Sequence, residues 1–235
     1  MQLPADLDAL LCMRYPALFA DRHADPDDYP MGRGFEIGPG WFALVDTLSA
    51  LLSAGPPYRA VQVKSKFGRL GFHLDASPRD PSAVTLARGL SMRVCEVSGR
   101  PGRRHCYRPT WIATLAPGVR LPHRYGIPEA EPSAFDLERP GSFVPPIGFA
   151  LEEMTAVRAD VLAGRTEIPA GWHDLADTVL QILQNSPGQP RVVRMRCDDA
   201  GLRIEWHEES TGLVSLSELA TALSRRIDRV TGVME

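Results

Sequence analysis

The chain has 235 residues, of which 44% are hydrophobic and 23% are charged, and its formal net charge is −3. This is the composition of a globular protein that can bury a core. The charge is too small to indicate a nucleic-acid or membrane partner by bulk electrostatics. Four scattered cysteines without a CxxC pair indicate reduced thiols. Asp6 and Asp8 stand where a signal peptide would be basic, so we expect a cytoplasmic protein without a membrane span.

The segment FADRHADPDDY at 19–29 gathers an imidazole and four carboxylates: Asp21, His23, Asp25, Asp27 and Asp28. Such groups can bind a divalent cation or transfer protons, and a metal-dependent hydrolase built on Asp21, His23 and Asp25 is one interpretation. Asp and Pro also favour turns. We therefore expect an acidic loop that contacts a partner through its aspartates.

An amphipathic helix is predicted from Trp41, because its apolar residues recur at steps of three and four. Two short alternating runs follow and predict a β-hairpin. The residues expected to face the core are Val61, Val63 and Phe67 in the first strand and Leu70, Phe72 and Leu74 in the second. A final helix is predicted over about 81–97.

A proline-punctuated connector is predicted over 100–146, anchored by Trp111, Ile112, Leu115 and Phe143. Its first part, RPGRRHCYR, is basic: Arg100, Arg103, Arg104 and Arg108 flank Tyr107. Arginines interleaved with an aromatic suit contacts to nucleic acid. A solvated loop or a protein-binding tip is the other interpretation of this segment, and the one we prefer.

The second half repeats the first after a shift of 131 residues. Gly-Trp, Leu and Asp-Thr recur in order, in GWFALVDTL at 40–48 and GWHDLADTV at 171–179. Matching hairpin runs and a final helix over 215–230 follow, for which Ser215 and Glu218 form a capping box. Internal similarity of this kind indicates duplication. It predicts that Trp41 and Trp172 are buried at equivalent positions.

The predicted fold class is therefore α+β, with two diverged α-β-β-α repeats. The chain divides into 1–99 with the first copy, the connector 100–146 and the second copy 147–235, forming one compact unit. A lone hairpin is marginal in water, so we expect the two hairpins to pair into one pseudo-two-fold, four-stranded antiparallel sheet with helices on one face. His73, Asp75, Glu205 and His207 would then form a polar stripe across its open face, for proton transfer or, as we prefer, partner binding.

Five segments resemble a family of small, uncharacterised bacterial and phage proteins over residues 10–116. They are YPALFADRH at 15–23, GFEIGPGWFALVDTL at 34–48, VQVKSKFGRLGFHL at 61–74, RVCEVSGRPG at 93–102 and WIATL at 111–115. The family pattern implies a small zinc site of four soft ligands. This chain keeps Cys95 but has Ser98 and Ala116 at two of the cysteine positions. His105 and Cys106 make poor substitutes, so we expect no metal.

Nucleophile elbows, P-loops, dinucleotide fingerprints and zincin helices do not occur in the sequence. The sequence therefore predicts a non-catalytic, cofactor-free binding protein whose partner is a protein, most concretely an immunity protein that neutralises a toxin. A nucleic-acid-associated protein of a phage or mobile element, using the basic segment 100–108, and the metal-dependent hydrolase remain the alternatives.

Overall fold

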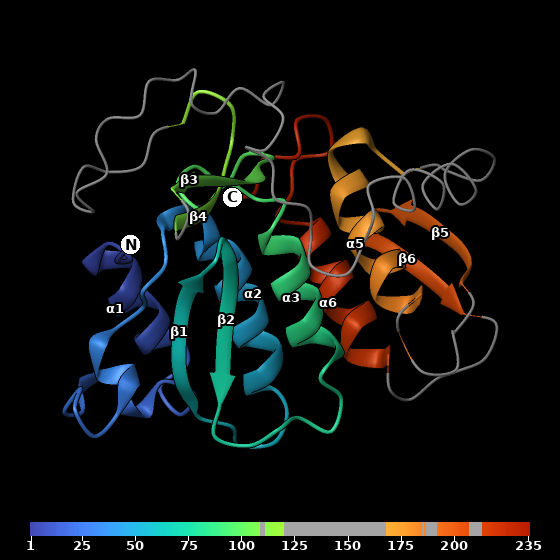
Figure 1. Cartoon of the computed structure of the whole chain (residues 1–235). Coiled ribbons are helices and arrows are strands. Elements are labelled where there is room, and N and C mark those ends of the chain that lie inside the picture. Colours follow the sequence, from blue (N-terminus) through green and yellow to red (C-terminus); the bar gives the residue numbers. More distant parts are fainter. Residues whose placement is uncertain (109–110, 120–167, 185, 187–191, 207–212) are drawn as a thin grey trace.

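The computed structural model describes residues 1–108, 111–119, 168–184, 186, 192–206 and 213–235 (Figure 1). The helices in these ranges are α1 (Ala5–Arg14), α2 (Phe42–Ser53), α3 (Ser82–Ser91), α5 (His173–Gln184) and α6 (Val214–Ser224). The strands are β1 (Ala60–Lys66), β2 (Arg69–Leu74), β3 (Arg103–Arg108), β4 (Trp111–Leu115), β5 (Val192–Asp198) and β6 (Gly201–Trp206). Helices and small antiparallel sheets together confirm the α+β class.

Each half has the same order of elements, namely a 3-10 turn, a helix, a hairpin and a second helix. The first half runs through Pro39–Trp41, α2, β1, β2 and α3, and the second through Ala170–Trp172, α5, β5, β6 and α6. The final helices are shorter than predicted, because α3 ends at Ser91 and α6 at Ser224. Both serine hydroxyls accept a hydrogen bond from the hairpin, from the amides of Leu70 and Leu202 at 2.8 and 2.7 Å.

The predicted four-stranded sheet is wrong, because β1–β2 and β5–β6 form separate two-stranded sheets. Figure 1 shows the two hairpins on opposite sides of α2, α3, α6 and α5, and α3 contacts both α5 and α6. The reason is that α2 buries residues almost all the way round, including Ala43, Val45, Leu48 and Ser49. A helix of that kind must be covered on several sides, so the halves meet through helices. One edge of β1 is covered by a bridge to Glu36.

The two halves make equivalent contacts at the repeated Gly-Trp pairs. Trp41 and Trp172 are 0% and 1% exposed, which confirms the predicted burial. The Trp41 indole donates to the Val94 carbonyl at 2.7 Å, and the Trp172 indole donates to the Ile227 carbonyl at 2.9 Å. Each ring thus ties the start of the first helix to the segment after the second. A common origin of the halves by duplication stays a prediction.

The contacts between the halves are reciprocal. Arg93 of the first half pairs with Asp177 of the second at 3.3 Å, and Arg226 of the second half pairs with Asp46 of the first at 3.2 Å. The hydroxyl groups of Ser82 and Ser215, which occupy matching positions, lie 3.0 Å apart. In a two-fold symmetric dimer the same surface serves on both sides, and these contacts have that form within one chain. The repeated Asp-Thr pair is therefore part of the seam.

A single hydrophobic cluster runs through both halves, from Leu3 to Met234, and includes both tryptophans. A smaller cluster lies under β3–β4 and is described below. In the part of the chain that the structure describes, no helix has the length and apolar character needed to cross a membrane.

Asp80 caps two helices at once, one from each half. Its carboxylate accepts hydrogen bonds from the amides of Ser82 at 2.9 Å and Ser215 at 3.0 Å. The predicted capping box at Ser215 is wrong, because α6 already begins at Val214 and shows no side-chain cap at the preceding Leu213. The acceptor comes instead from the other half, where the sequence pattern could not place it.

Replacing Asp80 by alanine is expected to lower the free energy of unfolding by about 2 kcal/mol at pH 7, because two helix amides lose their acceptor. Burial alone would raise the pKa of Asp80, but hydrogen bonds from Ser215 and Ser82 outweigh it and lower that pKa below its usual value. The contribution is therefore complete above the unfolded-state pKa near 4 and is lost as the pH falls through the folded-state value. Urea unfolding at pH 7 and pH 3 measures it, with exposed Asp28→Ala as the control. An equal loss for both variants would contradict the capping role.

Candidate protein-binding groove

The start of the predicted connector folds into the hairpin β3–β4 and packs onto the first half. The interpretation of Arg103–Arg108 as a loop is therefore wrong, since these residues form a strand paired with Trp111–Leu115. The amide of Glu96 donates to the Thr114 carbonyl at 2.9 Å, and the Thr114 hydroxyl donates to the Gly68 carbonyl at 2.5 Å. The hairpin thus covers both the turn between β1 and β2 and the segment that follows α3.

A small apolar cluster of Cys95, Ala113, Leu115 and Ala116 forms beneath this hairpin. Leu115 is 0% exposed, as its predicted anchoring role requires, and Ile112 is half-buried. The side chain of Trp111, like Phe143, lies outside the described residues. Cys95 and Ala116, which the resemblance placed at two cysteine positions of a zinc pattern, both belong to this apolar cluster. No group of three or more metal-binding side chains occurs among the residues described.

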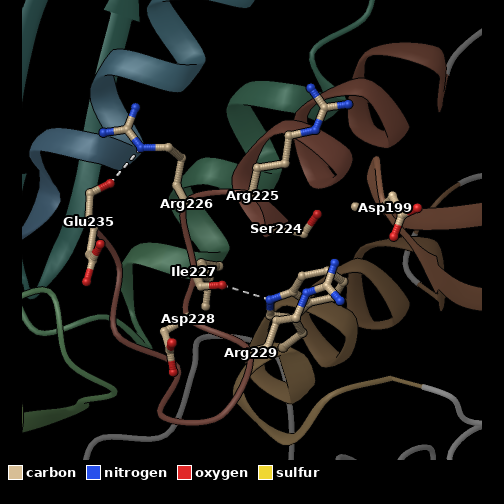
Figure 2. A pocket seen from close by; sticks show the side chains of 10 residues that line it. Asp199, Ser224, Arg225, Arg226, Ile227, Asp228, Arg229 and Glu235 are labelled. Atoms are coloured by element: carbon tan, nitrogen blue, oxygen red, sulfur yellow. Dashed lines mark hydrogen bonds between the residues drawn. The ribbon is translucent and has the colours of Figure 1, made fainter.

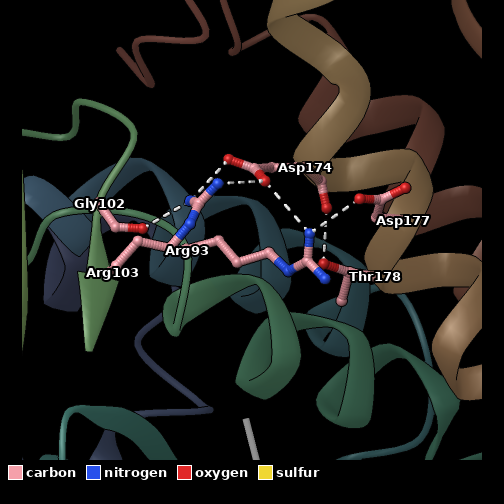
Figure 3. A network of polar contacts seen from close by, with 6 residues as sticks. All are labelled: Arg93, Gly102, Arg103, Asp174, Asp177 and Thr178. Carbon is pink, nitrogen blue, oxygen red and sulfur yellow. Dashed lines mark hydrogen bonds and ion pairs between the residues drawn. The ribbon is translucent and has the colours of Figure 1, made fainter. Parts of the chain in front are cut away.

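Two of the four basic residues assigned to nucleic acid have structural contacts. Arg104 is 3% exposed and donates to the Phe67 carbonyl at 3.0 Å. Arg103 pairs with Asp174 at 3.1 Å, beside the buried Arg93 and its partners (Figure 3). Arg100 is exposed, and Arg108 lies on β3 with a side chain outside the described set. These arginines therefore do not form the continuous basic loop that the alternative required.

A pocket of about 480 Å³ occupies the matching position in the second half (Figure 2). Its residues correspond to those that β3–β4 covers in the first half. Asp199 matches Phe67 in the hairpin turn, and Arg225 and Arg229 match Met92 and Glu96 after the final helix. The first half therefore fills this place with its own hairpin, whereas the second half presents a groove there, hereafter the second-half groove.

Two exposed arginines give the second-half groove its chemistry. The Arg225 guanidinium donates to the Ala200 carbonyl at 2.5 Å, where the first half uses the Thr114 hydroxyl on Gly68. The Arg229 guanidinium lies over the Trp172 ring at 5.1 Å and donates to the Asp198 carbonyl at 3.2 Å. These contacts leave further guanidinium donors for an incoming carboxylate, which arginine binds through paired hydrogen bonds.

The backbone of the second-half groove also offers a donor. In the first half the Glu96 amide is satisfied by the Thr114 carbonyl of β4. The amide of the matching Arg229 has no acceptor within the described ranges of the chain. The lining also includes the carboxylates of Asp199, Asp228 and Glu235. That of Asp228 is already occupied, since Thr231 and Val230 donate to it and lower its pKa. An extended segment with a free carbonyl and an acidic side chain would match both donors.

The predicted polar stripe does not form, because the two hairpins lie on opposite sides of the helices (Figure 1). His73 is exposed, whereas Asp75 accepts from the Arg59 amide at 2.9 Å. Glu205 pairs with Arg196 at 2.9 Å, and His207 lies outside the described residues. The predicted stripe requires both hairpins to share one sheet. Because the halves pack through helices, the hairpins form separate sheets and the stripe cannot form.

The acidic segment near the N-terminus forms turns rather than a metal site. Asp21 pairs with Arg59 at 3.6 Å, and Asp25 accepts from the amide of Asp27 at 3.0 Å. His23 is exposed, and no metal-holding group that includes Asp21, His23 and Asp25 is found within the described chain. Asp25, Asp27 and Asp28 are exposed and remain candidates for partner contacts.

The sequence interpretation missed Asp199, Arg225 and Arg229. The signal that could have found them is the alignment of the two copies, because Glu96 and Met92 of one copy are replaced by arginines in the other. Such charge differences at matched positions identify where the surfaces of the two halves differ.

Comparison with known proteins gives no match: no family model fits the chain, and neither a curated protein nor a solved structure shows significant similarity to it. The resemblance to a phage and bacterial family therefore stays a prediction.

Proposed function

We propose that this chain is a non-catalytic, cytoplasmic protein-binding protein that receives an extended segment of its partner in the second-half groove. The observation that supports this proposal is the position of the groove. The matching surface of the first half is occupied by β3–β4 through a backbone hydrogen bond to Glu96 and side-chain hydrogen bonds to the turn at Phe67 and Gly68. A surface built to hold a hairpin on one side of the molecule has the shape to hold a strand on the other.

The groove also defines the chemistry of the partner segment. Arg225 and Arg229 replace one apolar and one acidic residue, so the segment should carry a carboxylate facing them. Arginine at the centre of an interface contributes strongly to affinity. The most concrete version of the function is an immunity protein, which would neutralise a toxin by holding one of its acidic loops and so blocking the surface around it.

The double variant Arg225→Glu and Arg229→Glu is expected to weaken partner binding at least tenfold, about 1.4 kcal/mol. The matched control is Arg196→Glu with Arg203→Glu, which makes the same charge change on the β5–β6 hairpin, outside the residues that line the groove. The control should bind within about twofold of the original chain. The probe is the purified product of the adjacent gene, and the measurement is calorimetry after a thermal check of folding.

A display library of extended peptides provides a second probe that does not depend on gene order. Peptides selected on the original chain should be enriched in acidic residues and should lose binding to the double variant. If the neighbouring product forms no complex and no selected peptide distinguishes the double variant from its control, the proposed function is wrong.

A further inference from the structure

One face of the β1–β2 hairpin is cationic. The pairs Gln62 with His73, Lys64 with Gly71 and Lys66 with Arg69 alternate with the pairs that bury Val63, Leu70 and Phe72. Residues two apart in a strand share a face, so Lys64, Lys66, Arg69 and His73 lie together on the side away from the core. We call these four residues, with Arg88 of the neighbouring α3, the cationic hairpin face.

Arg88 belongs to this face because α3 runs beside β2 (Figure 1). Burial and then the charge of Arg69 lower the pKa of Arg88. Burial also lowers the pKa of His73, followed by the charges of Lys64, Arg88 and Lys66. The five groups are therefore close enough to repel one another.

One described carboxylate lies beside this face, because Glu36 bridges to β1 at Lys64 and accepts a hydrogen bond from Gln62 at 3.1 Å, but it pairs with none of the cations. Lys64, Lys66, Arg69 and Arg88 form no ion pair with any residue in the described ranges. The matching face of the second half differs, because Arg196 pairs with Glu205 and Arg203 with Asp198, both at 2.9 Å. In a chain whose net charge is negative, this concentration of positive charge on one hairpin would attract an anion.

Phe67 lies at the tip of the same hairpin in a strained conformation. Its φ is 54°, a value that a bulky residue rarely adopts, and the side chain is 50% exposed. The prediction that Phe67 faces the core is therefore wrong. The strained turn is held from behind, because Arg104 donates to the Phe67 carbonyl and Thr114 donates to that of Gly68. Strain combined with exposure of an aromatic is typical of functional positions.

We propose that the cationic hairpin face binds single-stranded nucleic acid, with Lys64, Lys66 and Arg69 contacting phosphates and Phe67 stacking on a base. Alternate residues of a strand lie about 6.6 Å apart, so the row of cations can follow one extended backbone. Lys66 already lies over the Phe67 ring, with Nζ 5.5 Å from its centroid. A cationic track with an aromatic platform is the recurrent form of single-strand binding sites.

An acidic protein fits this face less well. Protein interfaces are depleted of lysine and have an apolar centre, whereas the outward residues here are charged or polar and the exposed Phe67 stands at the tip. The proposed contacts use no side chain of the second-half groove or of the segment 100–108, although Arg104 supports the Phe67 carbonyl from behind. The proposal therefore neither depends on the proposed function nor repeats the nucleic-acid alternative drawn from the sequence.

The test is fluorescence anisotropy of a labelled twenty-nucleotide oligo-dT with the full chain at several salt concentrations. The triple variant Lys64→Gln, Lys66→Gln and Arg69→Gln should bind at least tenfold more weakly. Its salt dependence should be shallower by about 2 in log–log slope, since each phosphate contact on a single strand contributes about 0.7. Phe67→Asn should lose about tenfold in affinity while keeping or raising the melting temperature, because asparagine tolerates this turn.

The matched control is Arg196→Gln with Arg203→Gln on the second hairpin, which should leave oligonucleotide affinity unchanged. Equal loss in the control would show non-specific attraction and overturn the proposal. Tighter binding of a duplex of the same length, or of a poly-glutamate peptide at equal charge, would also overturn it. Absence of measurable binding by the original chain at low salt would do the same.

Discussion

Replacing Arg93 by alanine is expected to lower the free energy of unfolding by about 3–5 kcal/mol, the range for a buried ion pair that loses one member. Arg93 is 5% exposed, and its Nη1 lies 3.1 Å from Asp174 and 3.3 Å from Asp177 (Figure 3). Without it, the largely buried Asp177 carboxylate loses a cationic partner at the seam between the halves. Equilibrium unfolding in urea, followed by tryptophan fluorescence, measures the loss.

The reciprocal variant Arg226→Ala is the matched control and should cost only about 1 kcal/mol. The Arg226 side chain is 36% exposed, and its partner Asp46 keeps hydrogen bonds from Arg14 at 2.8 Å and Tyr15 at 2.9 Å. Solvent and these remaining donors offset most of the loss. Equal effects of the two arginine variants, or a cost of Arg93→Ala below about 1 kcal/mol, would contradict this assignment of the seam.

Alanine at Gly40 or at Gly171 is expected to destabilise the protein by about 3 kcal/mol, at the upper end of overpacking effects. An added Cβ at Gly40 would collide with the Cys95 carbonyl and lie 2.5 Å from the amide nitrogen of Gly99. At Gly171 it would collide with the Asp228 carbonyl and lie 2.7 Å from the nitrogen of Gly232. These are backbone atoms, so no side-chain rotation relieves the contact.

The control for both glycines is Gly55→Ala, since the nearest atom to an added Cβ there is the Leu52 carbonyl oxygen at 3.6 Å. This variant should be neutral or stabilise by up to about 1 kcal/mol through the unfolded state. Thermal unfolding of the three single variants compares them directly. A melting temperature of Gly40→Ala or Gly171→Ala that equals that of the control would show that the close approach is not required.

The seam explains why the same short motifs recur in the two halves. Gly-Trp brings the start of one helix against the turn after another, through the indole hydrogen bonds to Val94 and Ile227. The aspartates of the repeated Asp-Thr pair, Asp46 and Asp177, each form an ion pair with an arginine of the opposite half. The second-half groove and the cationic hairpin face lie where the copies differ, which is where substitution does not disturb this frame.

Much of the local structure was predictable from the sequence, because it depends on periodicity and on short motifs. The alternation of Val63, Leu70 and Phe72, the helical spacing after Trp41 and Trp172 and the burial of both indoles depend on local spacing, and the structure confirms them. The candidate site was predicted poorly. His73 and Glu205 were assigned to one site by assuming a shared sheet, whereas their hairpins form separate sheets. Arg225 and Arg229, which line the second-half groove, belong to no sequence motif that would have identified them.

By itself, the sequence determined that this is an α+β protein and that short motifs such as Gly-Trp and Asp-Thr occur in both halves. Only the tertiary structure decided that the halves join through helices. The helix α2 is buried on nearly every side, and the periodicity of its sequence does not show which elements cover it. The tertiary structure also decided that β3–β4 covers one turn while a groove remains at the other, since that depends on contacts between residues far apart in the chain. Both proposed binding sites depend on those long-range differences between two locally similar halves.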